Sequence, residues 1–247
     1  MVTPVLVALD VPTLAEAETL AGAVQGHVGG FKVGLELVMA EGPRAIRRIA
    51  ARGLPVLADV KLHDIPNTVR RAASRVRAAG ARWVTAHAAG GGKMLDAALA
   101  GMGGERGVLA VTVLTSLGDA DLAAAGADRS TGAQVELMAR LADDRGAEGV
   151  VCSPREAASV KEISSRLLVA TPGIRPHGAS IGDQRRTAAP VEALRSGADL
   201  LVIGRAITSA PDPAAAAAAI ASDIAAGTSG YRQPFRPGPP GHEAQES

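Results

Sequence analysis

The chain has 247 residues and a formal net charge of +1, with 47% apolar but only 2% aromatic residues. This length suits one large α/β domain whose core is built from Ala, Val, Leu and Ile. The near-zero charge and the scarcity of aromatic side chains argue against nucleic acid or membrane as a partner. The single cysteine, Cys152, excludes an internal disulfide.

Targeting signals are not expected in this sequence. The first residues lack a basic segment followed by a long apolar run, and no stretch of about 18 consecutive apolar residues occurs. The sequence therefore predicts a cytoplasmic protein. Cys152 lies in an apolar run and is expected to be a small buried residue rather than a nucleophile.

Short β-branched apolar runs alternate along the chain with stretches of helical composition. The predicted strands are Val5–Asp10, Phe31–Leu35, Pro55–Lys61, Trp83–Ala88, Gly107–Leu114, Gly149–Ser153, Leu167–Gly173 and Leu200–Ile207. The predicted helices lie near residues 14–26, 43–52, 67–79, 92–101, 131–145, 154–164, 189–196 and 213–226. Eight strand-then-helix repeats predict an α/β protein with the (β/α)8 TIM barrel fold, in preference to a doubly wound open sheet.

The domain organisation follows from the same pattern. No linker interrupts the repeats, so one barrel domain is expected over residues 1–227. The tail over residues 228–247 is rich in Pro, Gly and polar residues and is expected to be poorly ordered.

Helix boundary signals agree with these ranges. Thr13, Ser130 and Ser153 precede helical stretches as N-caps, and Pro154 takes a first helical position. Glycines at the helix ends are expected to adopt left-handed C-terminal caps, namely Gly53, Gly80, Gly146 and Gly197.

Charged residues interrupt two of the predicted strands. Asp59 and Lys61 alternate along the third strand and so point to the same side, Asp64 follows closely, and Lys32 lies inside the second strand. Burying unpaired charge is costly, so we expect Lys32, Asp59, Lys61 and Asp64 to gather at one strand end. A purely structural ion-pair network remains the alternative.

The use of lysine itself favours a chemical role. Of the 26 Lys and Arg residues only four are lysines, namely Lys32, Lys61, Lys93 and Lys161, and two of these interrupt apolar strands. Lysine differs from arginine in that its proton can be given up when the environment is tuned.

The loops after the seventh and eighth strands carry residues suited to a phosphate group. Barrel enzymes form their active sites at the carboxyl ends of the strands, and these two loops often bind phosphate. Glycine lets the backbone approach a ligand, and arginine grips phosphate with two hydrogen bonds. The candidates are Gly173, Arg175, Gln184, Gly204 and Arg205. The alternative is that the glycines serve tight turns and the arginines are solvated.

With these residues in view, the chain resembles the orotidine 5′-phosphate decarboxylase family. The motif D-x-K-x-x-D appears in ADVKLHDIPNTV at 58–69. The other matching segments, in the order of the family, are VALD at 7–10, FKVGLEL at 31–37, VTAHAAGG at 84–91, VTVLTS at 111–116, TPGIRP at 171–176, GDQRR at 182–186 and VIGRAI at 202–207. The resemblance spans nearly the whole barrel and omits only the tail.

The resemblance implies a reaction and a set of residue roles. The implied reaction is decarboxylation of orotidine 5′-monophosphate to uridine 5′-monophosphate and CO₂, the last step of de novo UMP synthesis, with neither metal nor cofactor. Lys61 would donate a proton to C6 of the pyrimidine, with Lys32, Asp59 and Asp64 completing the charged array. The implied substrate contacts are Asp10 and Lys32 to the ribose, Thr115 to the pyrimidine, and Arg175, Gln184, Gly204 and Arg205 to the phosphate.

The family resemblance also implies a homodimer. Asp64 would come from the partner subunit, with Ile65 and Thr68 crossing the interface beside it.

Two other functions remain open from the sequence. Metal-dependent sugar-phosphate decarboxylases such as 3-keto-L-gulonate-6-phosphate decarboxylase share the D-x-K-x-x-D element, but carry a carboxylate ligand on the second strand. Here that strand presents Lys32, and Glu36 is expected past its end. The other hypothesis is a barrel that binds a nucleotide phosphate without catalysing a reaction.

Overall fold

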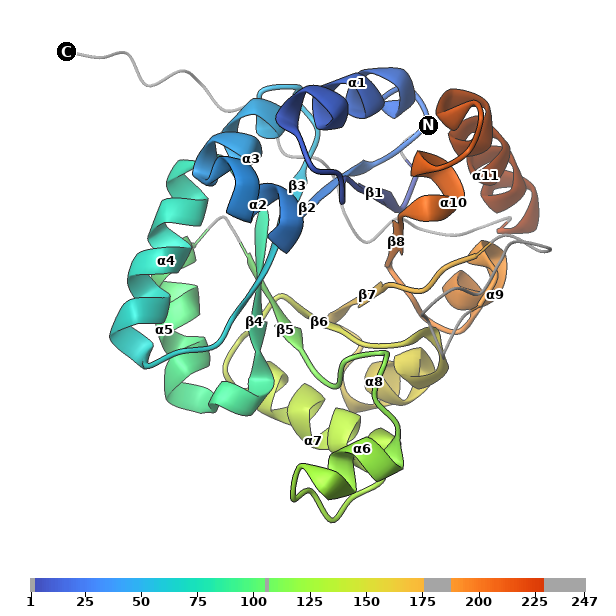
Figure 1. The fold of residues 1–247 in the computed structure, drawn as a ribbon. Helices are drawn as coiled ribbons and strands as arrows, with labels where there is room; N and C mark the ends of the chain where they lie inside the picture. Colours follow the sequence, from blue (N-terminus) through green and yellow to red (C-terminus); the bar gives the residue numbers. More distant parts are fainter. Residues whose placement is uncertain (1–2, 105–106, 176–187, 229–247) are drawn as a thin grey trace.

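The computed structural model describes residues 3–104, 107–175 and 188–228, and shows the predicted barrel. Parallel strands close on themselves in chain order, each paired with its sequence neighbours, and β8 pairs with β1. The strands are β1 (Val5–Ala8), β2 (Gly30–Gly34), β3 (Val56–Leu62), β4 (Trp83–His87), β5 (Gly107–Val111), β6 (Gly149–Val151), β7 (Leu168–Thr171) and β8 (Leu200–Ile203). Figure 1 views the barrel along its axis, with the helices forming an outer ring.

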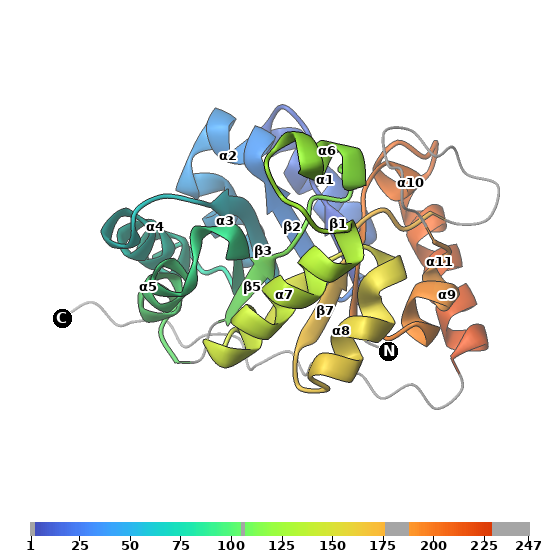
Figure 2. The same cartoon turned by 90° about the horizontal axis from the view of Figure 1, so that it is seen from below.

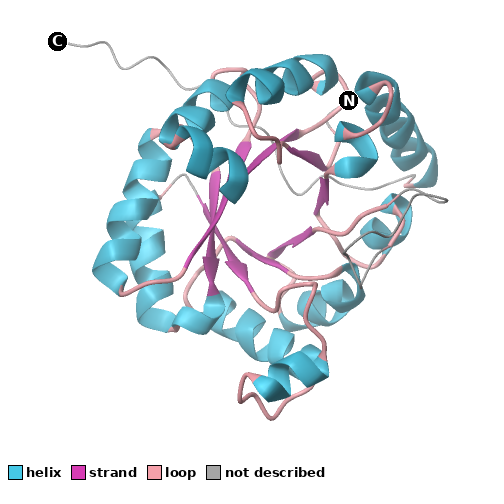
Figure 3. Cartoon of the chain, in the orientation of Figure 1, coloured by secondary structure: helices cyan, strands magenta, loops and turns pink. Residues whose placement is uncertain are grey.

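The helices of that ring follow the predicted ranges within a few residues. They are α1 (Leu14–Val24), α3 (Pro43–Ala50), α4 (Pro66–Ala78), α5 (Gly92–Met102), α7 (Thr131–Asp144), the turn η2 (Pro154–Glu156) with α8 (Ala157–Ile163), α9 (Pro190–Arg195) and α11 (Pro213–Gly227). Figure 3 shows the separation of strands inside and helices outside.

Three short helices and one turn were not predicted. They are α2 (Leu35–Glu41), α6 (Asp119–Ala124), α10 (Arg205–Thr208) and the turn η1 (Ala88–Gly90), all in connections that follow strands. The expected strand Leu200–Ile207 is therefore too long: β8 ends at Ile203, and Arg205 already begins α10. Seen from the side, α2, α6 and α10 project from one end of the barrel (Figure 2).

The predicted caps are confirmed. The hydroxyls of Thr13 and Ser130 accept hydrogen bonds from the backbone N–H groups of Glu16 and Ala133, and Ser153 caps the turn that begins at Pro154. The four glycines at helix ends all have positive φ angles: Gly53, Gly80, Gly146 and Gly197.

The core has two parts, which alternate along the strands as the two faces of a strand must. The larger part, between strands and helices, includes the buried Cys152, as predicted. The smaller fills the barrel itself and consists of Leu6, Ala8, Leu57, Trp83, Leu109, Leu168, Ala170, Leu200 and Val202. Leu57 lies beside Lys32 in the register of β2 and β3, and beside Trp83 in that of β3 and β4.

This register makes the barrel interior apolar at the amino ends of the strands and charged at the carboxyl ends. Two residues beyond Leu57 on β3 comes Asp59, and two beyond Trp83 on β4 comes Thr85, so both face inward. The interior positions near the carboxyl ends therefore hold Lys32, Asp59 and Thr85 rather than leucines.

Among the described residues, no helix combines the length and the apolar character needed to cross a bilayer. The predicted tail lies, apart from Thr228, outside the described residues, so its disorder stays a prediction.

Candidate active site

Lys32 is the most deeply buried of the charged residues at the carboxyl end of the barrel. It lies in the middle of β2 and is 7% exposed. Its Nζ lies 2.8 Å and 3.0 Å from the two carboxylate oxygens of Asp10, which follows β1, and 3.6 Å from Oδ2 of Asp59 on β3. The lysine thus bridges two carboxylates from the strands on either side of it.

Gly34 makes room for this bridge. A Cβ atom at Gly34 would lie 2.3 Å from Oδ1 of Asp10 and 2.8 Å from Nζ of Lys32, both too close for non-bonded atoms. The backbone angles of Gly34, φ −93° and ψ −177°, are open to other residues, so the constraint is one of space alone.

Asp59 connects this pair to the second lysine. Oδ1 of Asp59 lies 2.7 Å from Nζ of Lys61 and accepts a hydrogen bond of 3.0 Å from the hydroxyl of Thr85. Asp10, Lys32, Asp59 and Lys61 therefore form one continuous array of alternating charge, contributed by the ends of β1, β2 and β3. Continuous pairing of this kind is the condition under which charge tolerates burial.

The environment keeps Asp59 ionised. Burial alone would raise the pKa of Asp59, but the positive charges of Lys32 and Lys61 and the hydrogen bonds from Lys61 and Thr85 together lower this pKa below its ordinary value. At neutral pH Asp59 is therefore a carboxylate, and it holds the Lys61 ammonium in a fixed position.

The backbone at Lys61 departs from a regular strand. Lys61 has a φ angle of +49°, and the register between β3 and β4 shifts between Ala58 and Leu62. The N–H of Lys61 donates to the hydroxyl of Thr85 at 2.9 Å. Asp59 and Lys61 do meet, as the predicted alternation requires, but they meet on an irregular strand whose conformation is unusual for a residue with a side chain.

Asp64 is not part of the array in its own chain, which corrects the expectation drawn from spacing. Its side chain is exposed, and within the described residues it forms one hydrogen bond, from the backbone N–H of Ile65 at 2.6 Å, and no ion pair. Ile65 is 68% exposed and Thr68 is exposed in the first turn of α4. The fourth charge of the array is Asp10 instead.

The predicted phosphate residues that the structure describes lie in the loops after β7 and β8, and β8 is the neighbour of β1 in the barrel. Gly173 has a φ angle of +79°, and the half-buried Arg175 donates to the carbonyl of Ile174 at 3.0 Å. Gly204 is the N-cap of α10 and Arg205 its first residue. A Cβ atom at Gly204 would lie 3.6 Å from that of Ala8, so this loop lies over the end of β1. Gln184 lies outside the described residues.

Thr115 lies in the loop after β5, as expected, and is half-buried.

Two further residues that contribute to the site were not predicted. Thr85 binds both Asp59 and Lys61, and Gly34 leaves space for Asp10. A polar residue inside the apolar strand Trp83–His87 was the available signal for Thr85; no sequence signal singled out Gly34.

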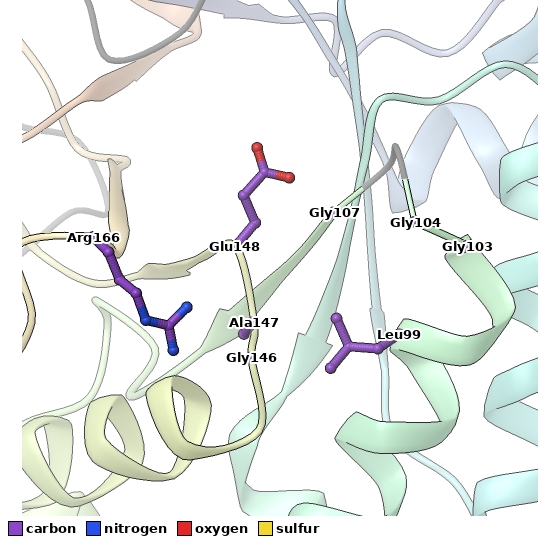
Figure 4. Close-up of a pocket in the computed structure, with 8 residues that line it drawn as sticks. All are labelled: Leu99, Gly103, Gly104, Gly107, Gly146, Ala147, Glu148 and Arg166. Atoms are coloured by element: carbon purple, nitrogen blue, oxygen red, sulfur yellow. The ribbon is translucent and has the colours of Figure 1, made fainter.

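A pocket of about 500 Å³ lies elsewhere, at the amino ends of β5 and β6. Figure 4 shows Glu148 and Arg166 on its wall together with Leu99 and several glycines. The charged groups already have partners: Glu148 pairs with Arg82, and Arg166 with Asp143. We assign no function to this pocket, because barrel active sites form at the opposite end.

The second strand does not offer the carboxylate that a metal-dependent relative would need. Glu36 lies in α2, past the end of β2, and is exposed, as the sequence indicated. In the described part of the chain, no group of three His, Cys, Asp or Glu side chains is arranged to hold a metal ion.

A closed parallel barrel with an array of lysines and aspartates at the carboxyl ends of its strands defines a barrel enzyme. Residues 3–220 match the family model described as "Orotidine 5'-phosphate decarboxylase / HUMPS family". The chain therefore belongs to the orotidine 5′-phosphate decarboxylase family, which confirms the resemblance.

Individual relatives agree with the family model. The chain is 54% identical over 218 residues to the orotidine 5′-phosphate decarboxylase of Anaeromyxobacter sp. (strain K), covering 88% of this chain and 96% of the relative. It is 48% identical over 230 residues to that of Moorella thermoacetica, covering 89% and 91%. The crystal structure of orotidine 5′-phosphate decarboxylase from Lactobacillus acidophilus superposes with a TM-score of 0.79 at 35% identity, covering 90% of this chain and 98% of that one.

Proposed function

We propose that this protein decarboxylates orotidine 5′-monophosphate to uridine 5′-monophosphate and CO₂, the last step of de novo UMP synthesis, without metal or cofactor. The observation that carries the proposal is the placement of Lys61. Its ammonium is held 2.7 Å from an ionised aspartate at the open end of the barrel, while Lys32 pairs with the other oxygen of that aspartate.

The reaction explains why such an array is useful. The bond between C6 and the carboxylate breaks, its electron pair stays on C6, and CO₂ leaves. The Lys61 ammonium stabilises this carbanion and then donates a proton to C6, after which water returns a proton to the lysine. The uncatalysed barrier is high, in the range where enzymes supply up to about 23 kcal/mol. Charges fixed before the reaction need no reorganisation during it, which is often the largest catalytic contribution.

The remaining members of the array bind and orient. Asp59 keeps Lys61 in place, and Asp10 and Lys32 contact the ribose hydroxyls. The half-exposed carboxylate of Asp10, paired with the buried ammonium of Lys32, supports this role. Thr115 contacts the edge of the pyrimidine.

The phosphate binds between the loops after β7 and β8, with Arg175, Gly204, Arg205 and Gln184 as its contacts. Arginine side chains supply charge-assisted hydrogen bonds there, and Gly204 lets the backbone approach closely. The position of Gly204 over the end of β1, on the rim that also carries Asp10, supports this assignment.

We also propose that the protein is a homodimer in which Asp64, with Ile65 and Thr68, completes the site of the partner subunit. Two observations support this arrangement. Asp64 makes no ion pair within the described residues of its own chain. Exposed apolar side chains follow β2 and β3 at the same end of the barrel, with Met39 76%, Ile65 68% and Leu35 45% exposed. Exposed apolar groups at the end of the barrel that also carries Asp64 fit a surface covered by a second copy.

Hybrid dimers test this arrangement. Lys61→Ala and Asp64→Ala each remove one half of a composite site, so each variant alone is expected to be nearly inactive. After unfolding and refolding an equal mixture, half of the dimers are hybrids with one intact site, and about a quarter of wild-type activity returns. No recovery on mixing, with both variants dimeric, would contradict a site shared between subunits.

The Lys61→Ala variant tests the chemistry by itself. The substitution is expected to remove most of kcat while the affinity for uridine monophosphate changes by less than about tenfold, since the proton donor acts mainly in the transition state. Near wild-type turnover by this variant would rule out Lys61 as the proton donor.

The cytoplasmic location and the absence of nucleic-acid and membrane partners remain predictions.

A further inference from the structure

Two histidines lie in contact beside the charged array and have no part in the mechanism above. His63 follows β3, two residues after Lys61, and His87 is the last residue of β4. Their ring centroids are 5.3 Å apart, with the ring planes inclined by 35°. His63 is exposed and His87 half-buried. The pair joins the loop that carries Asp64 to the end of the neighbouring strand.

The contact continues a set of interactions that β4 makes with the irregular end of β3. Thr85 and His87 are two residues apart and so lie on one face of β4. Thr85 accepts from the N–H of Lys61, and His87 contacts the ring of His63. One contact is made by the N–H of Lys61 itself and the other by His63, two residues later. Together they support the backbone of Lys61, whose φ angle of +49° is a conformation that needs support from its surroundings.

His63 is also packed from the side of the turn η1. A Cβ atom at Gly90 would lie 3.2 Å from Cδ2 of His63 and 2.2 Å from Sδ of Met94. The imidazole of His63 therefore lies close to both the His87 ring and the backbone of Gly90, although much of the residue is exposed to solvent. A side chain at position 90 would collide with the thioether of Met94 and press against the ring of His63.

We propose that His63 and His87 are positioning residues that hold the segment from Lys61 to Asp64 against β4 by ring contact, and thereby fix the Lys61 ammonium and present Asp64 at the rim. This inference rests on the proposed decarboxylation and on the shared site. It adds a requirement that the proposed reaction and the shared site do not contain. Positions 63 and 87 must each carry an aromatic ring, whether or not that ring has nitrogen atoms.

A neutral ring at position 87 suits this role. Burial, the neighbouring His63 and the Lys61 ammonium lower the pKa of His87, and the opposing effect of Asp59 is smaller. Lys61, Asp59 and His63 are the charged and titratable groups that act on this ring. His87 is therefore uncharged at neutral pH and adds no repulsion to Lys61, so a phenyl ring is expected to replace it in function.

The test compares removal of the ring with removal of its nitrogens. His63→Ala is expected to lower kcat for orotidine 5′-monophosphate by about 10- to 100-fold with KM changed less than about threefold, because a shift of about 1 Å at Lys61 affects the transition state most. His63→Phe is expected to keep kcat within about threefold of wild type. His87→Ala and His87→Phe make the same comparison of kcat at the partner position. They replace the His63 variants if substitution at position 63 prevents folding.

The controls separate this proposal from the proposed function. His27→Ala removes an exposed histidine after α1, away from the array, and is expected to leave kcat unchanged. A wild-type protein without decarboxylase activity would refute the function itself. Wild-type activity with an unaffected His63→Ala would overturn the positioning role, and equal losses in His63→Ala and His63→Phe would show that the nitrogen atoms matter instead.

Discussion

Replacing Gly34 with alanine tests the geometry of the array without removing any charged group. The added Cβ would lie 2.3 Å from Oδ1 of Asp10, whereas ordinary contacts begin at 3.4 Å, so the carboxylate must move by about 1 Å. Nζ of Lys32, at 2.8 Å, must also retreat. A misplacement of about 1 Å in a catalytic array costs up to about 100-fold in rate, equivalent to about 2.7 kcal/mol of barrier.

Stability is expected to change little in this variant. The backbone angles of Gly34 suit alanine, the Asp10 carboxylate is half exposed and has room to shift toward solvent, and the buried Lys32 keeps Asp59 as its second partner. We therefore expect kcat/KM for orotidine 5′-monophosphate to fall about 100-fold while the free energy of unfolding changes by less than about 1 kcal/mol.

Steady-state kinetics and urea unfolding measure the two quantities. Gly26→Ala is the matched control, because no heavy atom lies within 4 Å of the Cβ position there. A Gly34→Ala variant with kcat/KM within about twofold of wild type would refute the reasoning, since the bridge from Lys32 to Asp10 would then be dispensable.

Three further predictions follow from other parts of the structure. Arg205→Ala should lower kcat/KM for orotidine 5′-monophosphate by about 10- to 100-fold, which corresponds to the loss of one charged hydrogen bond. The kcat/KM for the phosphate-free nucleoside should not change. Equal losses on both substrates would place the phosphate elsewhere. Because the pKa of Asp59 is lower in the folded than in the unfolded protein, its contribution to stability is complete above about pH 4 to 5 and is lost as the pH falls through the folded pKa. The free energy of unfolding of wild type relative to Asp59→Asn should accordingly rise with pH in the acid range and level off above it, and a pH-independent difference would contradict the assigned shift. Lys161→Met should lower the free energy of unfolding in urea by roughly 2 kcal/mol with kcat unchanged, because it removes an ammonium 2.6 Å from the buried Asp199. Arg44→Met breaks an exposed ion pair and should lower the free energy of unfolding by less than about 0.5 kcal/mol. Equal losses in the two variants would contradict the role of burial.

The barrel was predictable from the sequence because its signals repeat. Each strand is a β-branched apolar run and most helices carry a capping residue or a terminal glycine, so an error in one element leaves the repeat visible. The short helices α2 and α10 were not predictable in this way. The helix α2 begins directly after β2, and α10 begins one residue after β8; periodicity does not separate such short runs into strand and helix.

The array was predictable in part. Lysine inside an apolar strand requires partners, which identified Lys32, and alternation paired Asp59 with Lys61. Spacing alone failed at Asp64, because regular alternation breaks at Lys61, which has a positive φ angle, and the register with β4 shifts there. Thr85 was missed because threonine is an ordinary strand residue, and its two hydrogen bonds depend on the register between β3 and β4.

Decarboxylation of orotidine 5′-monophosphate by purified protein treated with EDTA tests the central claim most directly. The reaction is followed by the loss of the ultraviolet absorbance of the substrate, with 3-keto-L-gulonate 6-phosphate and magnesium as the comparison. The charged array predicts rapid turnover of the nucleotide without added metal and none of the sugar phosphate. Turnover of the sugar phosphate alone, restored by magnesium, would contradict the proposed function.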